Sequence, residues 1–279
     1  MEHHITQELI EDYCASLAED EKAAGTIQKY RRDLVAFMHF LDGRSVTKEL
    51  AASWKEDLQK RNYAPRTINS MLAAINGFFS FMDWGIKIRF LKIQKQMFRE
   101  ASRELSRKEY DRLLTAARES GQERLTLIME TLCATGIRIS ELRDITVEAA
   151  QRGKATVSLK GKIRTILLST KLCRKLLKYA KKQKITAGEI FLTGSGKSIS
   201  RRQVWFELKR LCKAAGVEAS KVFPHNFRHL FATIFYRACK DIARLADVLG
   251  HSSIETTRIY LTVSGGDQAR QLDRLGLVS

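Results

Sequence analysis

The sequence predicts a mainly α-helical protein of two domains, with one small β-hairpin in the second domain. Amphipathic segments with helical spacing fill most of the 279 residues, and the composition, rich in Lys, Arg, Leu and Ala, includes only two prolines. Only the stretch 153–169 alternates as paired strands do. A chain of this length can form two domains that each bury a core.

Four helices are predicted in the first domain, residues 1–91. Apolar residues recur at helical spacing in "TQELIEDYCASLAE" and in "TIQKYRRDLVAFMHFL". A third helix covers 47–61, and a fourth has Pro65 in its first turn and Gly85 after its end. Four helices with short connections favour a small bundle. The polar, basic and aperiodic segment 92–104 is the predicted linker.

The second domain, residues 105–279, begins with the capping box "SRKE", in which Ser106 caps the helix and Glu109 completes the motif. Gly136 ends the second helix, and a short helix starts at Ser140 and Glu141. The hairpin at 153–169 turns at "KGK". The other helices are predicted over 106–119, 122–135, 170–183, 199–215, 224–239, 241–249, 253–262 and 265–276.

Positive charge is concentrated in the second part of the chain. The net charge is +18; residues 1–100 contain 15 Lys and Arg against 14 Asp and Glu, so residues 101–279 have a net charge of +17. This asymmetry predicts a polyanionic partner, with DNA or RNA first and an anionic membrane surface second.

Cysteines and terminal segments predict the compartment. The five cysteines are scattered, odd in number and never spaced as C-x-x-C, which argues against a disulfide framework or a zinc ribbon. The start "MEHHITQELIEDY" lacks the basic and apolar regions of a signal peptide, and no stretch resembles a membrane span. We therefore expect a cytoplasmic protein.

Six residues carry the chemistry that the sequence suggests: Arg138, Lys160, His225, Arg228, His251 and Tyr260. Guanidinium groups bind phosphate oxygens in bidentate fashion, and an ammonium or imidazole group can move a proton. Together these groups suit phosphoryl transfer without a metal ion. We expect no cofactor.

A metal site is the weaker interpretation of two of these positions. His225 and His229 are four residues apart, as zinc ligands on a helix often are, but the glutamate of H-E-x-x-H is missing.

Two tyrosines are also set aside as nucleophiles. Tyr236 lies among apolar residues and is expected in the core, whereas Tyr179 lies in a basic helix and is expected to contact phosphate or solvent.

Four motifs, "ATGIRISEL", "LKGKIRTILL", "PHNFRHLFAT" and "LGHSSIETTRIY", resemble in order and spacing those of the tyrosine recombinases, the lambda-integrase class. The resemblance is greatest to the small Xer-type members and covers nearly the whole chain. It implies the tyrosine recombinase fold: a four-helix, SAM-like core-binding domain and a mixed helical catalytic domain with a small sheet. It also implies site-specific DNA recombination through strand cleavage and exchange.

The resemblance assigns a role to each candidate residue. Tyr260 would attack a DNA phosphodiester, form a 3′-phosphotyrosyl bond and release a 5′-hydroxyl. Because a free phenol has a pKa near 10, it is a poor nucleophile at neutral pH. His225 would take or hold the proton of Tyr260. Arg138 and Arg228 would bind the charged transition state, with His251 as a further donor.

Lys160 would protonate the leaving 5′-oxygen from the tip of the hairpin. The family usually has G-K-G here, whereas this chain has "LKGKIR", which lacks the first glycine. Lys160 aligns best with the family's lysine and Lys162 is the second candidate. A solvated basic turn is the remaining interpretation.

The resemblance also implies contacts with double-stranded DNA and between protomers. The DNA-binding candidates lie on the two helices that enter major grooves in relatives: Lys29, Arg31, Arg32, Arg66 and Asn69. Several of them could instead only solubilise the bundle. The tail 264–279 docks on a neighbouring protomer in relatives, which form a tetramer on two DNA sites. Here it could also fold back on its own domain.

Two other functions remain open from the sequence. A type IB topoisomerase-like enzyme would relax DNA by the same chemistry without pairing two sites. A non-catalytic, sequence-specific DNA-binding regulator would keep the fold, and the unusual hairpin around Lys160 keeps this alternative open. Accessory recombination factors, and the choice between chromosome dimer resolution and the movement of a mobile element, are not determined by the sequence.

Overall fold

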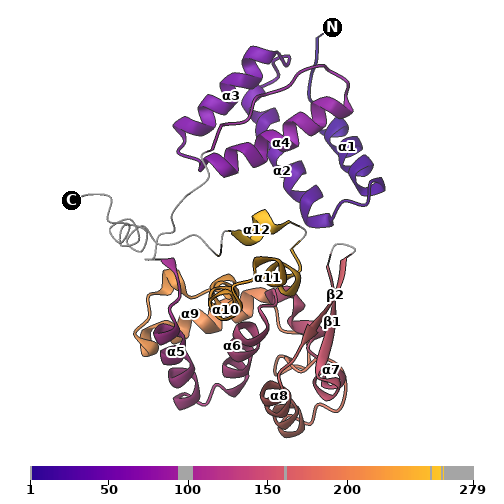
Figure 1. Ribbon diagram of the computed structural model, residues 1–279. Helices are drawn as coiled ribbons and strands as arrows, with labels where there is room; N and C mark the ends of the chain where they lie inside the picture. Colours follow the sequence, from indigo (N-terminus) through magenta and orange to yellow (C-terminus); the bar gives the residue numbers. More distant parts are fainter. Residues whose placement is uncertain (1, 94–102, 160–161, 252, 259, 261–279) are drawn as a thin grey trace, which may run out of the picture. The chain divides into compact units, whose positions relative to one another are not determined.

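The computed structural model describes residues 2–93, 103–159, 162–251, 253–258 and 260. The chain divides into two compact units, Met1–Lys95 and Gln96–Ser279. Each unit has its own hydrophobic core. The architecture is mainly helical with one two-stranded sheet among the described residues, so the predicted fold class is confirmed (Figure 1).

The N-terminal unit is a bundle of the four predicted helices, which are α1 (Gln7–Glu19), α2 (Ala24–Leu41), α3 (Lys48–Lys60) and α4 (Pro65–Phe81). Aromatic side chains fill its core: Phe37, Trp54, Phe78 and Phe79 are each at most 2% exposed. Pro65 occupies the first turn of α4, as predicted, because its missing N–H has no partner to lose there. Gly85, after the end of α4, has a φ of +67°.

Two asparagines of α4 fasten the extended segment that follows it. Asn69 donates to the carbonyl of Leu91 (2.9 Å) and accepts from its N–H (2.8 Å). Asn76 makes the same pair of hydrogen bonds with Ile88, at 2.9 and 2.8 Å. Both asparagine side chains therefore satisfy backbone groups of a segment that belongs to no sheet among the described residues.

The C-terminal unit is a group of packed helices with a small hairpin at one side (Figure 1). Its elements are α5 (Arg107–Glu119), α6 (Glu123–Thr135), η2 (Ile139–Asp144), α7 (Val147–Arg152), β1 (Lys154–Leu159), β2 (Lys162–Leu167), α8 (Thr170–Lys182), α9 (Arg201–Ala215), η3 (Ala219–Lys221), α10 (Pro224–Cys239), α11 (Ile242–Leu249) and α12 (Ile254–Arg258).

The boundaries of these elements follow local signals. Ser106 and Glu109 form the predicted capping box, and Gly136 ends α6 in the left-handed conformation with a φ of +64°. The short helices α7 and η3 were not predicted. The predicted helix 265–276 lies outside the described residues, as do the tail 264–279 and most of the linker 92–104.

The hairpin presents one face to the core of the unit. Its strands are antiparallel, with Ala155 opposite Ile166 and Val157 opposite Arg164. Ala155, Val157 and Ile166 are buried, whereas the alternate residue Leu167 is 78% exposed. α7 and α8 lie beside this hairpin (Figure 1). Arg164 is thus a cation on the inward face of β2.

One expectation about a tyrosine is wrong. Tyr179 was expected to meet phosphate or solvent, but it is 7% exposed and packs in the core of the C-terminal unit. It shares a stripe of α8 with Leu172 and Leu176, while the basic residues of that helix lie on its other face. None of the described helices is long and apolar enough to cross a membrane.

Candidate active site

Arg228 is the centre of the candidate site. It lies in the second turn of α10 and is 1% exposed. Its Nη1 donates to the carbonyl of Gly136 at 2.5 Å, and its Nη2 donates to the carbonyl of Leu249 at 2.7 Å. These carbonyls belong to the ends of α6 and α11, which leave carbonyl groups without helical partners. One guanidinium therefore ties three helices together.

His251 receives the third hydrogen bond of this guanidinium. Its Nε2 lies 2.9 Å from Nη2 of Arg228, and its Nδ1 lies 2.8 Å from Oγ1 of the buried Thr257. Because arginine can only donate, Nε2 accepts and the ring proton sits on Nδ1. Burial, together with the charges of Arg228 and Arg138, lowers the pKa of His251 to about 4. The imidazole is therefore neutral at neutral pH.

Tyr260 lies directly against these residues and is 4% exposed. Its ring stacks on His251, with centroids 5.8 Å apart and an angle of 10° between the planes. The ring of His229 packs edge-on against it, with centroids 4.5 Å apart. A hydrogen bond with Tyr260 partly offsets the lowering of the pKa of Arg228 that burial causes. The phenol thus meets the buried guanidinium.

Arg138 is the more accessible guanidinium of the site, with 34% of its side chain exposed. It precedes η2 and is held by the buried Glu141, which accepts from its backbone N–H (2.7 Å) and from Nη1 (3.1 Å). The oxygen that accepts from the Arg138 N–H, Oε2, also accepts from Nη2 of Arg164 at 2.6 Å. Arg138, Arg164 and Arg228, called here the arginine cluster, all act on the pKa of His251.

The remaining predicted residues differ in how far the structure describes them. His225 is exposed in the first turn of α10, and its ring packs edge-on against His229 at 4.6 Å between centroids. Its charge also acts on the pKa of His251, which places it near the site. Lys160 lies outside the described residues, and Lys162 opens β2 opposite Leu159.

Three residues of the site were not singled out by sequence reasoning: Glu141, Arg164 and Thr257. Glu141 follows Arg138 by three residues, a spacing that a capping interaction requires, so a signal was present. Arg164 could have been found from strand alternation, since Ile166 and Leu168 on the same face are apolar. Thr257 had no signal, because its contact with His251 depends on the turn between them.

The arrangement can bind an anion next to a phenol. Arg228 is buried, and among the described residues no carboxylate forms an ion pair with it. Arg138 retains exposed surface beside it. A phosphate group would supply the missing negative charge, and its oxygens match the donor geometry of two guanidiniums. These groups have the chemistry that attack by a hydroxyl on a phosphodiester requires.

The predicted DNA-binding residues of the N-terminal unit fall into two groups. Lys29 binds the buried Asp33 (2.5 Å) and the carbonyl of Ser70 (2.9 Å), Arg31 pairs with Glu11, and Asn69 holds Leu91. Arg32 lies 3.4 Å from Asp33 but keeps 76% of its side chain exposed, and Arg66 is exposed; both line a cavity of about 520 Å³ that Lys29 also lines. The second group is thus the more available to a ligand.

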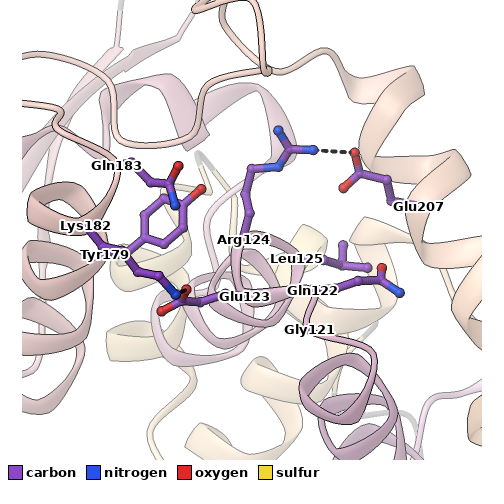
Figure 2. A pocket seen from close by; sticks show the side chains of 9 residues that line it. All are labelled: Gly121, Gln122, Glu123, Arg124, Leu125, Tyr179, Lys182, Gln183 and Glu207. Atoms are coloured by element: carbon purple, nitrogen blue, oxygen red, sulfur yellow. Dashed lines mark hydrogen bonds and ion pairs between the residues drawn. The ribbon is translucent and has the colours of Figure 1, made fainter.

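Another pocket, of about 380 Å³, lies in the C-terminal unit, and none of the predicted site residues lines it (Figure 2). Arg124 points across it to Glu207, with 2.6 Å between Nη2 and Oε1, and Lys182 pairs with Glu123 at 2.5 Å. Both cations are thus neutralised by carboxylates. In the part of the chain that the structure describes, no three His, Cys, Asp or Glu side chains are placed to hold a metal ion.

Comparisons with known proteins show which protein families the two units match. Residues 103–265 match the model of the phage integrase family, and residues 10–84 match that of the phage integrase N-terminal SAM-like domain. The tyrosine recombinase XerC of Roseiflexus castenholzii is 29% identical over 278 residues, covering 91% of this chain and 88% of that protein.

Solved structures share the fold. The XerH site-specific recombinase bound to its difH substrate, a pre-cleavage complex, has a TM-score of 0.70 at 18% identity, covering 95% of this chain and 84% of that chain. A lambda integrase tetramer bound to a Holliday junction has a TM-score of 0.70 at 20% identity, covering 91% of this chain and 76% of that chain.

Proposed function

The chain belongs to the phage integrase family as a tyrosine recombinase of Xer type, and we propose that Tyr260 is the nucleophile with which it cleaves DNA. The protein carries out site-specific recombination by tyrosine-mediated strand cleavage and exchange. The assignment of individual residues to that reaction is our proposal. The observation that carries it is the contact of Tyr260 with the buried Arg228, with which no carboxylate of the described residues forms an ion pair.

The proposed reaction conserves one phosphodiester-type bond at each step. The phenol oxygen of Tyr260 forms a bond to phosphorus, the bond from phosphorus to the 5′-oxygen breaks, and a 3′-phosphotyrosyl linkage results. The phenol proton passes to His225 or through it to solvent, and Lys160 donates a proton to the leaving 5′-oxygen. Attack by a second 5′-hydroxyl reverses these events and reseals the strand without ATP.

The arginine cluster stabilises the transition state in this proposal. Negative charge develops on the non-bridging oxygens, and Arg138 and Arg228 donate to them from fixed positions. The N–H of His251 points to Thr257, so its Nε2 holds the guanidinium of Arg228 in the free protein. Its role as a further donor to phosphate stays a prediction.

We further propose that the protein binds double-stranded DNA and assembles as a tetramer on two sites, with the tail 264–279 exchanged between protomers. A tetramer on a Holliday junction is described for the lambda integrase that shares the fold, which supports this. Arg32 and Arg66 are the proposed phosphate contacts of the N-terminal unit, because their charges are the most available. A cytoplasmic location and help from accessory factors complete the proposal.

Covalent trapping tests the proposed nucleophile. The full chain is incubated in EDTA with nicked suicide duplexes made from candidate sites near its own gene, and denaturing gels are read for a protein–DNA adduct. We expect an adduct that disappears in Tyr260→Phe. The substitution keeps the ring in its apolar cluster of Leu245 and Leu249, so folding should be retained.

Tyr236→Phe is the matched control, because Tyr236 is a second tyrosine packed against the same cluster. It should leave the adduct unchanged. An adduct that survives in Tyr260→Phe, or one that is lost on chelation, contradicts the proposal. Tight binding to a candidate site without any adduct would favour a DNA-binding regulator instead.

A further inference from the structure

Arg164 is a charged residue on the face of a strand that otherwise packs into the core. Its neighbours on that face of β2 are Ile166, 5% exposed, and beyond the strand Leu168, 6% exposed. Only 14% of the Arg164 side chain is exposed. An arginine is placed this way at a cost in desolvation unless its donors are all used. The contacts of its donor groups therefore indicate the role of Arg164.

The first contact of Arg164 is with the carboxylate that holds Arg138. Glu141 is 2% exposed, and its single negative charge is divided between two guanidiniums: Oε1 faces Arg138 and Oε2 faces Arg164. If Arg164 were absent, Arg138 alone would neutralise this buried charge. The pair between Glu141 and Arg138 would then tighten and draw the Arg138 guanidinium away from a bound phosphate.

The second contact is with the turn that carries His251. Nη1 of Arg164 donates to the carbonyl of Val248 at 2.5 Å, and Arg228 binds the next carbonyl along, that of Leu249. Both carbonyls lie in the last turn of α11, where helical partners are missing. Two arginines from different elements therefore hold one helix end in place.

Gly250 allows Arg164 to reach this turn. A Cβ at position 250 would lie 2.5 Å from Cδ and 2.9 Å from Nε of Arg164, far inside van der Waals contact. The glycine also has a φ of +63°, which ends α11 and turns the chain into His251. The side chain of Arg164 thus passes directly over the backbone that positions the imidazole.

We infer that Arg164 is a positioning residue for strand cleavage: it holds Glu141 and the turn Val248–His251 so that Arg138, Arg228 and His251 face the same phosphate. The inference rests on the proposed function of that site. It assigns Arg164 no contact with DNA. Its effect is to set the geometry of groups that meet the transition-state charge, where a displacement of about 1 Å can cost about 100-fold in rate.

Arg164→Met tests the inference through the rate of cleavage within bound complexes. The substrate is the suicide duplex cleaved by the wild-type protein, at saturating protein concentration. We expect the first-order rate to fall by about 10-fold to 100-fold, with the dissociation constant for DNA changed by less than about threefold, since most affinity comes from phosphate contacts elsewhere. Arg164→Lys, with one point charge in place of a planar fork, should be intermediate.

A second substrate separates positioning from a general loss of structure. A methylphosphonate at the scissile position removes the charge that Arg138 and Arg228 neutralise, so it should bring the ratio of wild-type to Arg164→Met rates close to one. Arg138→Met should behave in the same way, whereas Lys160→Met should not. Arg174→Met, which removes an exposed arginine of α8, is the matched control and should change neither rate ratio.

Amide hydrogen exchange tests the same inference without DNA. The N–H of Arg138 is held by Glu141, and the N–H of His251 is bound to the carbonyl of Ala246. Both should exchange at least about tenfold faster in Arg164→Met, while core amides of α6 should not change. Unchanged exchange at both positions, or a wild-type cleavage rate in Arg164→Met, overturns the inference. Absence of cleavage by the wild-type protein would instead count against the function of Tyr260.

Discussion

Both units of the chain bury a charged side chain, Asp33 in the N-terminal unit and Arg228 in the C-terminal unit. Asp33 is 2% exposed and is neutralised by two cations, Lys29 at 2.5 Å and Arg32 at 3.4 Å. Arg228 is 1% exposed, and among the described residues its guanidinium contacts two carbonyl oxygens, a neutral imidazole and the phenol of Tyr260, but no carboxylate.

In the proposed function, this difference separates a structural charge, Asp33, from a charge that takes part in the reaction, Arg228. A buried charge that is fully paired contributes to one folded arrangement and has nothing left to offer a ligand. A buried cation whose partners are only dipoles keeps its attraction for an anion, and the low dielectric around it strengthens that attraction. Arg228 is therefore prepared for a phosphate, whereas the site of Asp33 is complete without one.

The largest expected effect follows from the unpaired charge. Arg228→Lys keeps the charge but cannot bind both carbonyls and His251 with a planar fork. We expect the cleavage rate within bound complexes to fall by about 1000-fold, in the range found when a preorganised donor to a developing charge is removed. DNA affinity should change by less than about fivefold, because most phosphate contacts lie elsewhere.

Single-turnover cleavage and binding, measured on the same duplex, check this prediction. Lys213→Ala removes a cation of α9 that is exposed, and it serves as the control. If Arg228→Lys cleaves within tenfold of the wild-type rate, the buried guanidinium is not what meets the transition state. Arg228 would then be a structural charge, as Asp33 is.

The loss of Asp33, the paired charge, should lower stability and leave the cleavage rate unchanged. Asp33→Ala leaves Lys29 without its carboxylate, and we expect the free energy of unfolding to fall by about 2 kcal/mol, less than for a fully buried pair because Lys29 retains 30% exposure. Cleavage within bound complexes should not change. Urea unfolding measures the first effect, with Asp12→Ala, an exposed aspartate of α1, as control.

A large loss of cleavage in Asp33→Ala, with stability unchanged, would reverse our assignment of the two charges. A gain in DNA affinity would agree with it, because Lys29 would then lose its carboxylate partner and could bind phosphate. It would also show that Lys29, a DNA-contact candidate from the sequence, is kept from phosphate by its pairing with Asp33.

The sequence predicted helices better than it predicted partners. Signals within one turn, such as the capping box of Ser106 or Pro65 at the start of α4, depend only on neighbouring residues, and the structure has them where expected. The six residues of α7 are too short for a periodic pattern to detect. Tyr179 was misjudged because lysines around it hid the apolar stripe of its helix.

Side-chain partners depend on distances along the chain that a pattern does not contain. Asn69 binds a backbone group 22 residues later, and Arg164 binds Glu141 across 23 residues. Residue type and position made Asn69 a candidate DNA contact, whereas Arg164 was not singled out. Only the fold shows that Asn69 is used within its own unit, and that Arg164 joins two motifs that the sequence presented separately.

The smallest expected effect is on the pH dependence of stability that His251 contributes. The pKa of His251 responds to the charge of Arg228. Burial and then the charges of Arg228 and Arg138 lower the pKa to about 4, against about 6.5 in an unfolded chain. The unfolded state therefore binds a proton first as pH falls, so this residue reduces stability progressively between pH of about 6.5 and 4. In His251→Gln this part of the pH dependence should be absent.

Nuclear magnetic resonance titration of His251 can then compare the free and the DNA-bound protein. A phosphate beside Arg228 and Arg138 would offset their positive charge, so its binding should raise the pKa of His251, because two of the causes that lower it are weakened. The same rise is expected in Arg228→Met without DNA, where one of those charges is removed. Asp33→Ala should leave the titration of His251 unchanged. A pKa of His251 that is the same with and without DNA would mean that no phosphate reaches the arginine cluster, and the distinction between the paired and the unpaired charge would not extend to function.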